Sequence, residues 1–230
     1  VFVDGTGDGD LAAWAGAETE IGREEDGHCQ PMTLCFRMMN VNIEAMPSRA
    51  EINELYDAAR ERGEITNPRE NVLKFFTPHD REVHFNTTRI VMHDATDAEE
   101  LTDAELIGRR QVREMVRFLR DHVRGFEDAW LAEMAPQIGI RESRRVIGDH
   151  VLSVDEVLEA RKSEDGIARG SYGVDIHNPA GTGTVIQHLP PGEAYDIPYR
   201  CITPRGFDNL LIAARCISAD HAAHSSMRVM

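Results

Sequence analysis

The sequence lacks any apolar run of membrane-spanning length. A membrane-spanning helix needs about 20 consecutive apolar residues, and no stretch of about 18 occurs here. The first residues also show none of the charged, apolar and small-residue regions that make up a secretory signal peptide. We therefore expect no membrane partner.

Closely spaced cysteines are also lacking. The four cysteines, Cys29, Cys35, Cys201 and Cys216, form no CxxC pair. Zinc ribbons and iron–sulfur clusters need several thiolates at short spacing, so we expect neither, and no other metal site. Isolated thiols in a chain of this size are typical of a reducing compartment, which predicts buried structural cysteines and a cytoplasmic location.

Positive charge is scarce. The chain carries 40 acidic and 25 basic residues, for a net charge of −15. Nucleic-acid binding needs a basic face, so we expect no nucleic-acid partner. Many of the arginines fall between Arg109 and Arg145, so the positive charge is local.

The apolar patterns predict a mixed α and β architecture. Capping boxes mark three helix starts, at Ser48 with Glu51, at Thr102 with Glu105 and at Ser153 with Glu156. Helices are predicted over residues 11–18, 48–63, 99–123, 126–134 and 153–162. Strands are predicted over residues 1–3, 30–42, 71–78, 81–94, 138–147, 167–177 and 209–214, with a loop over 178–193.

The opening "VFVDGTGDGD" invites three interpretations. A calcium loop starting at Asp4 would need a carboxylate at its twelfth position, which is Ala15. An aspartate nucleophile would have to stand two residues before Asp4, where Phe2 is found. A glycine-rich turn between a strand and a helix suits a dinucleotide, although the GxGxxG fingerprint is absent. A solvated acidic turn without a ligand remains the alternative.

Four segments, the first of which contains this turn, give it a context: "VFVDGTGDGDLAAWAGAE", "QPMTLCFRM", "GIRESRRVIGDHVLSVDEV" and "YDIPYRCITPRGFDNLLIAARCISADHAAHSSMRVM". In this order they resemble the FAD-dependent oxidoreductases of the two-domain, glutathione-reductase-like class. The resemblance is to the subgroup related to the flavin subunit of heterodisulfide reductase, and it covers nearly the whole chain.

This resemblance implies part of a Rossmann-like FAD-binding domain with an inserted α+β substrate domain. Residues 1–19 and 196–230 would belong to the FAD domain and residues 20–195 to the substrate or cap domain. The family's GxGxxG turn lies upstream, so the resemblance implies an internal piece of a larger flavoenzyme. Gly5 and Ala214 depart from the family pattern, which has Ala and Gly there, and the methyl group of Ala214 is expected to crowd the flavin.

The resemblance also implies roles for individual residues. In the opening turn, Asp4, Gly5, Thr6, Gly7 and Asp8 are expected to bind FAD. Near the end of the chain, Ser218 is expected to cap a helix that begins near Ala219, and Arg215 and Arg228 are expected to stabilise negative charge on the reduced flavin.

Candidate catalytic residues lie beside these motifs. In "RESRR", a strand would place Arg141 and Arg145 on one face as an oxyanion fork, with Arg144 opposite. Tyr199 could hydrogen-bond substrate or flavin. His177 and His221 are the candidates for proton transfer.

Two functions from different classes follow. The first is an FAD-dependent oxidoreductase that transfers a hydride between a small-molecule substrate and flavin. The second is a binding or interaction module with no cofactor and no activity of its own. A calcium-stabilised carbohydrate-binding domain is a third, weaker reading.

Overall fold

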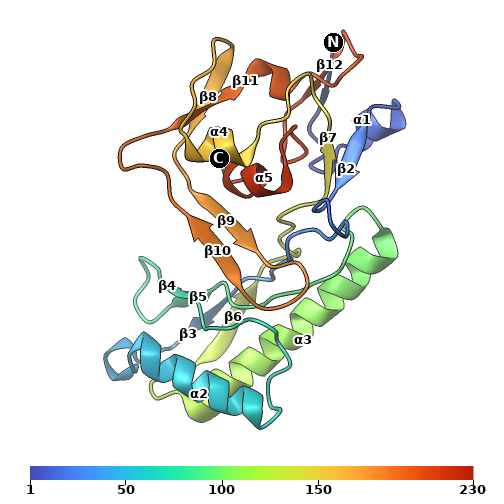
Figure 1. Cartoon of the computed structure of the whole chain (residues 1–230). Helices are drawn as coiled ribbons and strands as arrows, with labels where there is room; N and C mark the ends of the chain where they lie inside the picture. Colours follow the sequence, from blue (N-terminus) through green and yellow to red (C-terminus); the bar gives the residue numbers. More distant parts are fainter. Residues whose placement is uncertain (230) are drawn as a thin grey trace.

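The computed structural model describes residues 1–229 and has a mixed α/β fold (Figure 1), as the sequence predicts. Within that range the helices are α1 (Asp10–Trp14), α2 (Arg49–Glu61), α3 (Ala98–His122), α4 (Val154–Leu158) and α5 (His221–Met227), with 3-10 turns at Ile43–Ala45 and Tyr199–Cys201. The strands are β1 (Phe2–Asp4), β2 (Thr19–Ile21), β3 (Phe36–Met39), β4 (Lys74–Phe76), β5 (Val83–Phe85), β6 (Trp130–Met134), β7 (Arg144–Val146), β8 (Gly166–Gly170), β9 (Val174–His177), β10 (Thr184–Gln187), β11 (Tyr195–Pro198) and β12 (Leu210–Ile212).

The first and last strands lie side by side. β1 pairs in parallel with β12, with Phe2 opposite Leu210 and Asp4 opposite Ile212. The sequence predicts a buried opening strand, and this is wrong for Phe2 and Val3, which are 62% and 56% exposed. Strand β1 pairs only with β12 in a two-stranded sheet among the described residues, and of the three residues of β1 only Asp4 is buried.

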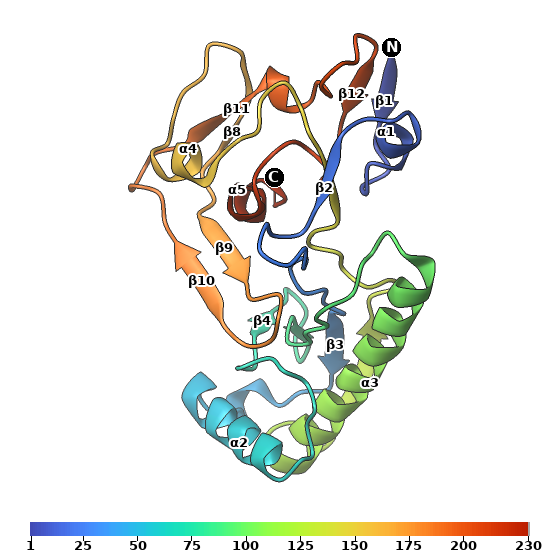
Figure 2. The same cartoon turned by 45° about the vertical axis from the view of Figure 1, so that its right-hand side comes forward.

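The middle of the chain builds a separate apolar core at the other end of the molecule (Figure 2). Its antiparallel sheet has the strand order β4-β5-β3-β6, and α2 and α3 pack beside it. Phe36 stacks on Phe85 with ring centroids 4.9 Å apart, and Tyr56 meets Phe118 edge-on at 5.5 Å. Ser48 and Glu51 form the predicted capping box at the start of α2.

Two predictions for this region need correction, the helix over 126–134 and the capping box of Thr102 and Glu105. Residues 130–134 form strand β6 and not a helix, because their backbone pairs with β3 and this tertiary pairing overrides a helix-prone composition. Helix α3 is capped by Asp97, which accepts from the backbone N–H groups of Glu99 and Glu100. Thr102 lies inside the helix and donates its hydroxyl to Ala98 O.

The remaining strands surround α4 and α5. β8 pairs with β11 and β9 pairs with β10, both antiparallel. The predicted single strand over 167–177 is therefore two strands, and the predicted loop over 178–193 contains β10. Leu152, Val157, Val174, Tyr195 and Ala223 form the second core between these strands and the two helices. No helix within residues 1–229 combines the length and the apolar character that crossing a bilayer requires.

Candidate functional site

The turn after β1 is held together by one buried carboxylate. Asp4 Oδ1 accepts from Thr6 N at 3.0 Å and from Thr6 Oγ1 at 2.7 Å, and Asp4 Oδ2 accepts from Ala12 N at 2.8 Å. Burial raises the pKa of Asp4, but these donors outweigh it and hold the pKa below its ordinary value. Asp4 and Thr6 therefore fix the shape of the turn and the start of α1.

Asp8 joins the turn to two distant segments. Asp8 Oδ1 accepts from Ser143 Oγ at 2.5 Å and from Arg215 Nη2 at 2.6 Å. Gly7 has φ +91°, and a Cβ there would lie 2.9 Å from the Arg215 guanidinium. Glycine is required because the backbone conformation is left-handed and the arginine lies directly over it. At Gly5, by contrast, a Cβ would meet nothing within 4 Å, so the backbone borders open space.

The arginines of "RESRR" go to three different places. Arg144 Nη1 donates to Asp8 O at 3.2 Å and to Asp10 Oδ1 at 3.0 Å, so this predicted catalytic residue lies against the opening turn. Buried Arg145 donates to Gly22 O and Ala219 O and pairs with Glu142. Arg141 donates instead to Pro31 O and Thr33 Oγ1. The predicted fork of Arg141 and Arg145 is therefore wrong, because β7 begins only at Arg144.

His221 and Glu142 form a buried pair next to this turn. His221 Nδ1 lies 2.8 Å from Glu142 Oε2, and Glu142 is fully buried. Burial raises the pKa of Glu142, but the hydrogen bond from His221 and the charge of Arg145 hold it below its ordinary value. In a neutral ring whose Nδ1–H donates to the carboxylate, Nε2 carries the lone pair. Among residues 1–229, Nε2 is buried without a hydrogen-bond partner. Such a nitrogen can accept a proton from a bound molecule.

The predicted helix cap at Ser218 is wrong. Asp220 caps α5 by accepting from Ala223 N at 2.7 Å. Ser218 is fully buried, and its hydroxyl accepts from Gly148 N at 2.9 Å. One turn into α5, buried His224 donates from Nε2 to Arg215 O at 2.6 Å and fixes the backbone that carries Arg215.

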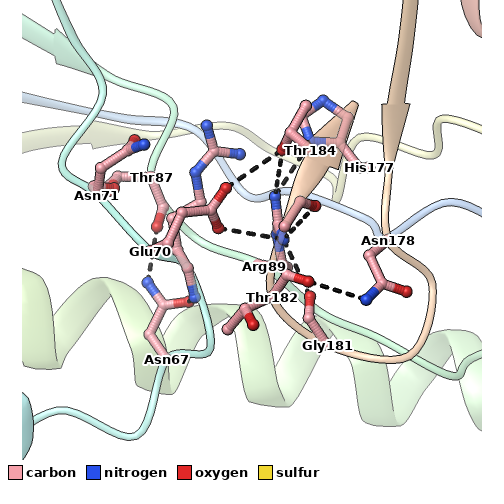
Figure 3. A network of polar contacts seen from close by, with 12 residues as sticks. Asn67, Glu70, Asn71, Thr87, Arg89, His177, Asn178, Gly181, Thr182 and Thr184 are labelled. Carbon is pink, nitrogen blue, oxygen red and sulfur yellow. Dashed lines mark hydrogen bonds and ion pairs between the residues drawn. The ribbon is translucent and has the colours of Figure 1, made fainter. Parts of the chain in front are cut away.

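His177 belongs to a different network, centred on a buried arginine (Figure 3). Arg89, which is 1% exposed, donates from Nη2 to His177 Nδ1 and Thr184 Oγ1, both at 3.1 Å. Its Nη1 donates to Gly181 O at 2.9 Å and lies 3.2 Å from Glu70 Oε2. Arg89 therefore fastens the β9–β10 hairpin to the segment that follows β5.

Both ring nitrogens of His177 are engaged. Nδ1 must accept, because a guanidinium only donates, and Nε2 lies 3.6 Å from Asp175 Oδ1. Burial lowers the pKa of His177, which keeps the ring neutral. His177 is thus a positioned side chain without a free nitrogen, whereas His221 has one.

Two predicted residues lie away from these groups. Tyr199 is 42% exposed in the 3-10 turn before β12, and none of the contacts within residues 1–229 that define the Asp8 or His221 groups involves it. A polar hollow of 290 Å³ lies near it, lined by His150, Glu156, Asp196, Pro198 and Arg200 among others. Arg228 ends α5, and its charge acts on Asp175 and Tyr172.

Sequence reasoning missed Glu142, Ser143 and Arg89. Glu142 and Ser143 stand within "RESRR", and an acid and a hydroxyl between arginines were the available signal. Arg89 gave no signal, because a single arginine in a strand pattern is usually exposed.

The residues around the opening turn fit a bound FAD. Within the part of the chain that the structure describes, Arg215 Nε and His221 Nε2 are buried without a partner, although most such groups in proteins are satisfied. The backbone at Gly5 is open to an approaching group, and the Arg215 cation lies over the turn. Ala214 packs against the apolar cluster around Ala12 and Ile212.

Comparison with known proteins agrees with this fit. The family model described as FAD dependent oxidoreductase matches residues 1–230. Searches of curated proteins and of solved structures gave no match. The description of this family names FAD as its cofactor, and a flavin-linked redox function follows from membership of the family. Because the match spans the entire sequence, the chain belongs to the FAD-dependent oxidoreductase family.

Proposed function

We propose that this chain forms the flavin- and substrate-contacting part of an oxidoreductase that transfers a hydride between a small-molecule substrate and FAD. The observation that carries the proposal is the pair of unpartnered donor and acceptor nitrogens, Arg215 Nε and His221 Nε2, beside the glycine turn. When bound, FAD supplies the hydride acceptor or donor. We further place the protein in the subgroup related to the flavin subunit of heterodisulfide reductase.

The cofactor side is proposed to comprise residues 1–19 and 196–230, and the substrate side residues 20–195. Segment 142–146 links the two, because Ser143 holds Asp8 while neighbouring Glu142 holds His221. Gly5, Gly7 and Asp8 would contact the cofactor, and Asp4 and Thr6 would shape that contact. Arg215 and Arg144 supply cations that favour negative charge at the turn.

His221 is proposed as the proton acceptor. When a hydride leaves a carbon that bears a hydroxyl or amine, the O–H or N–H proton of that group must also be removed. Nε2 of a neutral His221 can accept this proton. Glu142 holds the ring by Nδ1 and stabilises the imidazolium that results. His177, Tyr199 and Arg228 are proposed to contact the substrate, His177 from the substrate side and Tyr199 and Arg228 from the cofactor side.

FAD titration followed by visible absorption tests the cofactor assignment. We expect saturable FAD binding by the natural full-length protein. Arg215→Gln should weaken it about tenfold, which corresponds to one lost charge-assisted hydrogen bond. Arg205→Gln is the matched control, because Arg205 pairs with exposed Glu18 at the surface. Absence of flavin binding would refute the proposal and leave the cofactor-free interaction module as the better account.

Replacement of His221 by Asn tests the proton acceptor. Asn keeps a donor toward Glu142 and cannot take up a proton. With a substrate that reduces the wild-type flavin, the variant should bind FAD normally but reduce it about 100-fold more slowly. Unchanged reduction across the pH range would exclude His221 from this role.

A further inference from the structure

Four arginines from separate segments gather around strand β9. Arg89 contacts His177, and His177 Nε2 faces Asp175. The segment that follows Gln30 is next to them, because His177 N donates to Gln30 Oε1 at 3.4 Å. Arg141 donates to that segment at Pro31 O, 2.5 Å away.

Helix α5 packs against the same part of β9. Asp175 N donates to Ser225 Oγ at 3.0 Å, which ties β9 to the helix whose end carries Arg228. Tyr172 Oη donates to Asp175 Oδ2 at 3.2 Å. Burial, together with the nearby charges of Arg228, Arg69 and Arg89, lowers the pKa of Arg141 to about 9. We name Arg69, Arg89, Arg141 and Arg228 the arginine cluster.

The arginine cluster has too little negative charge around it. Among residues 1–229 its four cations face the carboxylates of Asp175 and Glu70, while His177 is neutral. The charge of Glu142 also acts on Arg228, but that carboxylate is paired with Arg145 and His221. Two positive charges are therefore left over, in a chain whose net charge is −15. Burying unbalanced charge is costly unless a counter-ion joins it.

Hydrogen-bond donors are left over as well. Among the described residues 1–229, Arg69 Nε and Arg228 Nε are buried without a partner. The same holds for Nε2 of Gln30, whose Oε1 accepts from His177 N. Arg69 is itself only 6% exposed. Three donor nitrogens without a partner and two excess positive charges around β9 are what an oxyanion would satisfy.

We propose that the arginine cluster binds a small oxyanion with two negative charges, carried by the substrate as carboxylate or phosphate groups. Guanidinium groups recognise both chemistries through paired N–H donors. The assignment of the oxyanion to the substrate rests on the proposed function, whereas the binding site itself does not depend on it.

Calorimetric titration of the full-length protein tests the site. The probes are succinate, inorganic phosphate and the neutral analogue succinamide. We expect saturable 1:1 binding of succinate or of phosphate and none of succinamide, and the better of the two anions identifies the source of the charge. The absence of saturable binding by both anions would overturn the proposal.

Variants locate the binding. Arg69→Gln should weaken the anion about tenfold, and Arg161→Gln, an exposed arginine paired with Glu159, should not. Arg228→Gln repeats the test if Arg69→Gln does not fold, as judged by circular dichroism. Equal affinity in all variants would refute the site.

The flavin spectrum, recorded on the same samples, separates the two proposals. FAD binding without anion binding removes this inference only. Anion binding without FAD binding keeps the oxyanion site and removes the oxidoreductase assignment.

Discussion

His224 makes the fold sensitive to mild acid. The side chain is fully buried and donates from Nε2 to Arg215 O at 2.6 Å. Its Nδ1 has no partner among residues 1–229. Burial lowers its pKa from 6.5 to about 4, and the opposing charge of Glu142 does not restore it. Protonation at Nδ1 would place an unpaired charge in the interior.

The direction and size of the effect follow from this shift. As the pH falls below 6.5, the unfolded chain binds a proton that the folded chain refuses, so unfolding becomes easier. The loss continues down to pH 4 and amounts to about 3 kcal/mol in total, at about 1.4 kcal/mol for each pH unit. At pH 5 it is about 2 kcal/mol, while carboxylates of ordinary pKa are still mostly ionised. A domain of typical stability, about 5–15 kcal/mol, would lose a sizeable part of it.

Urea unfolding of wild type and His224→Gln at pH 7.5 and pH 5 measures the effect. Glutamine keeps an amide donor toward Arg215 O but cannot titrate. His177 and His84, whose pKa values burial also lowers, contribute equally to both proteins. The variant should therefore lose about 2 kcal/mol less than wild type between the two pH values. The same loss in both proteins would refute the reasoning.

Three further outcomes are expected from urea unfolding near neutral pH. Arg89→Met should lower the free energy of unfolding by about 3–5 kcal/mol, since it leaves Glu70 and the β9–β10 hairpin without their buried partner. The surface control Arg205→Met should lower it by less than about 1 kcal/mol. Equal losses would contradict the anchoring role of Arg89. Gly22 and Gly16 both have positive φ, but a Cβ at Gly22 would stand 2.1 Å from Gly27 O, whereas Gly16 borders open space. Gly22→Ala should therefore lower the free energy of unfolding several times more than Gly16→Ala. Similar losses would show that the backbone around Gly22 shifts to admit the methyl group. Ser48→Ala should cost about 1 kcal/mol by removing the cap of α2, and no change would mean that the capping box contributes nothing.

Local chemistry was readable from the sequence. The caps at Ser48 and Ser153 predict the starts of α2 and α4, because a capping box involves only residues three apart. The strands predicted over 71–78 and 81–94 contain β4 and β5, which pair with each other. The glycine turn after β1 was likewise visible, since left-handed backbone needs glycine at positions such as Gly7.

Partners far apart in the sequence were not readable. Residues 130–134 look helical on their own and become β6 because β3 offers an open edge. Glu142 meets His221 across 79 residues, and Arg89 meets Gly181 across 92. Periodicity reports which side of an element is buried but not which element covers it.

The sequence by itself determined the mixed α/β class, the capped helices and the glycine turn, because each depends on the chemistry of neighbouring residues. Only the tertiary structure decided that Asp8, Ser143 and Arg215 meet, that His221 keeps a free nitrogen and His177 does not, and that four arginines share one place. These outcomes depend on which distant segments pack together, and that choice is made by the whole core at once.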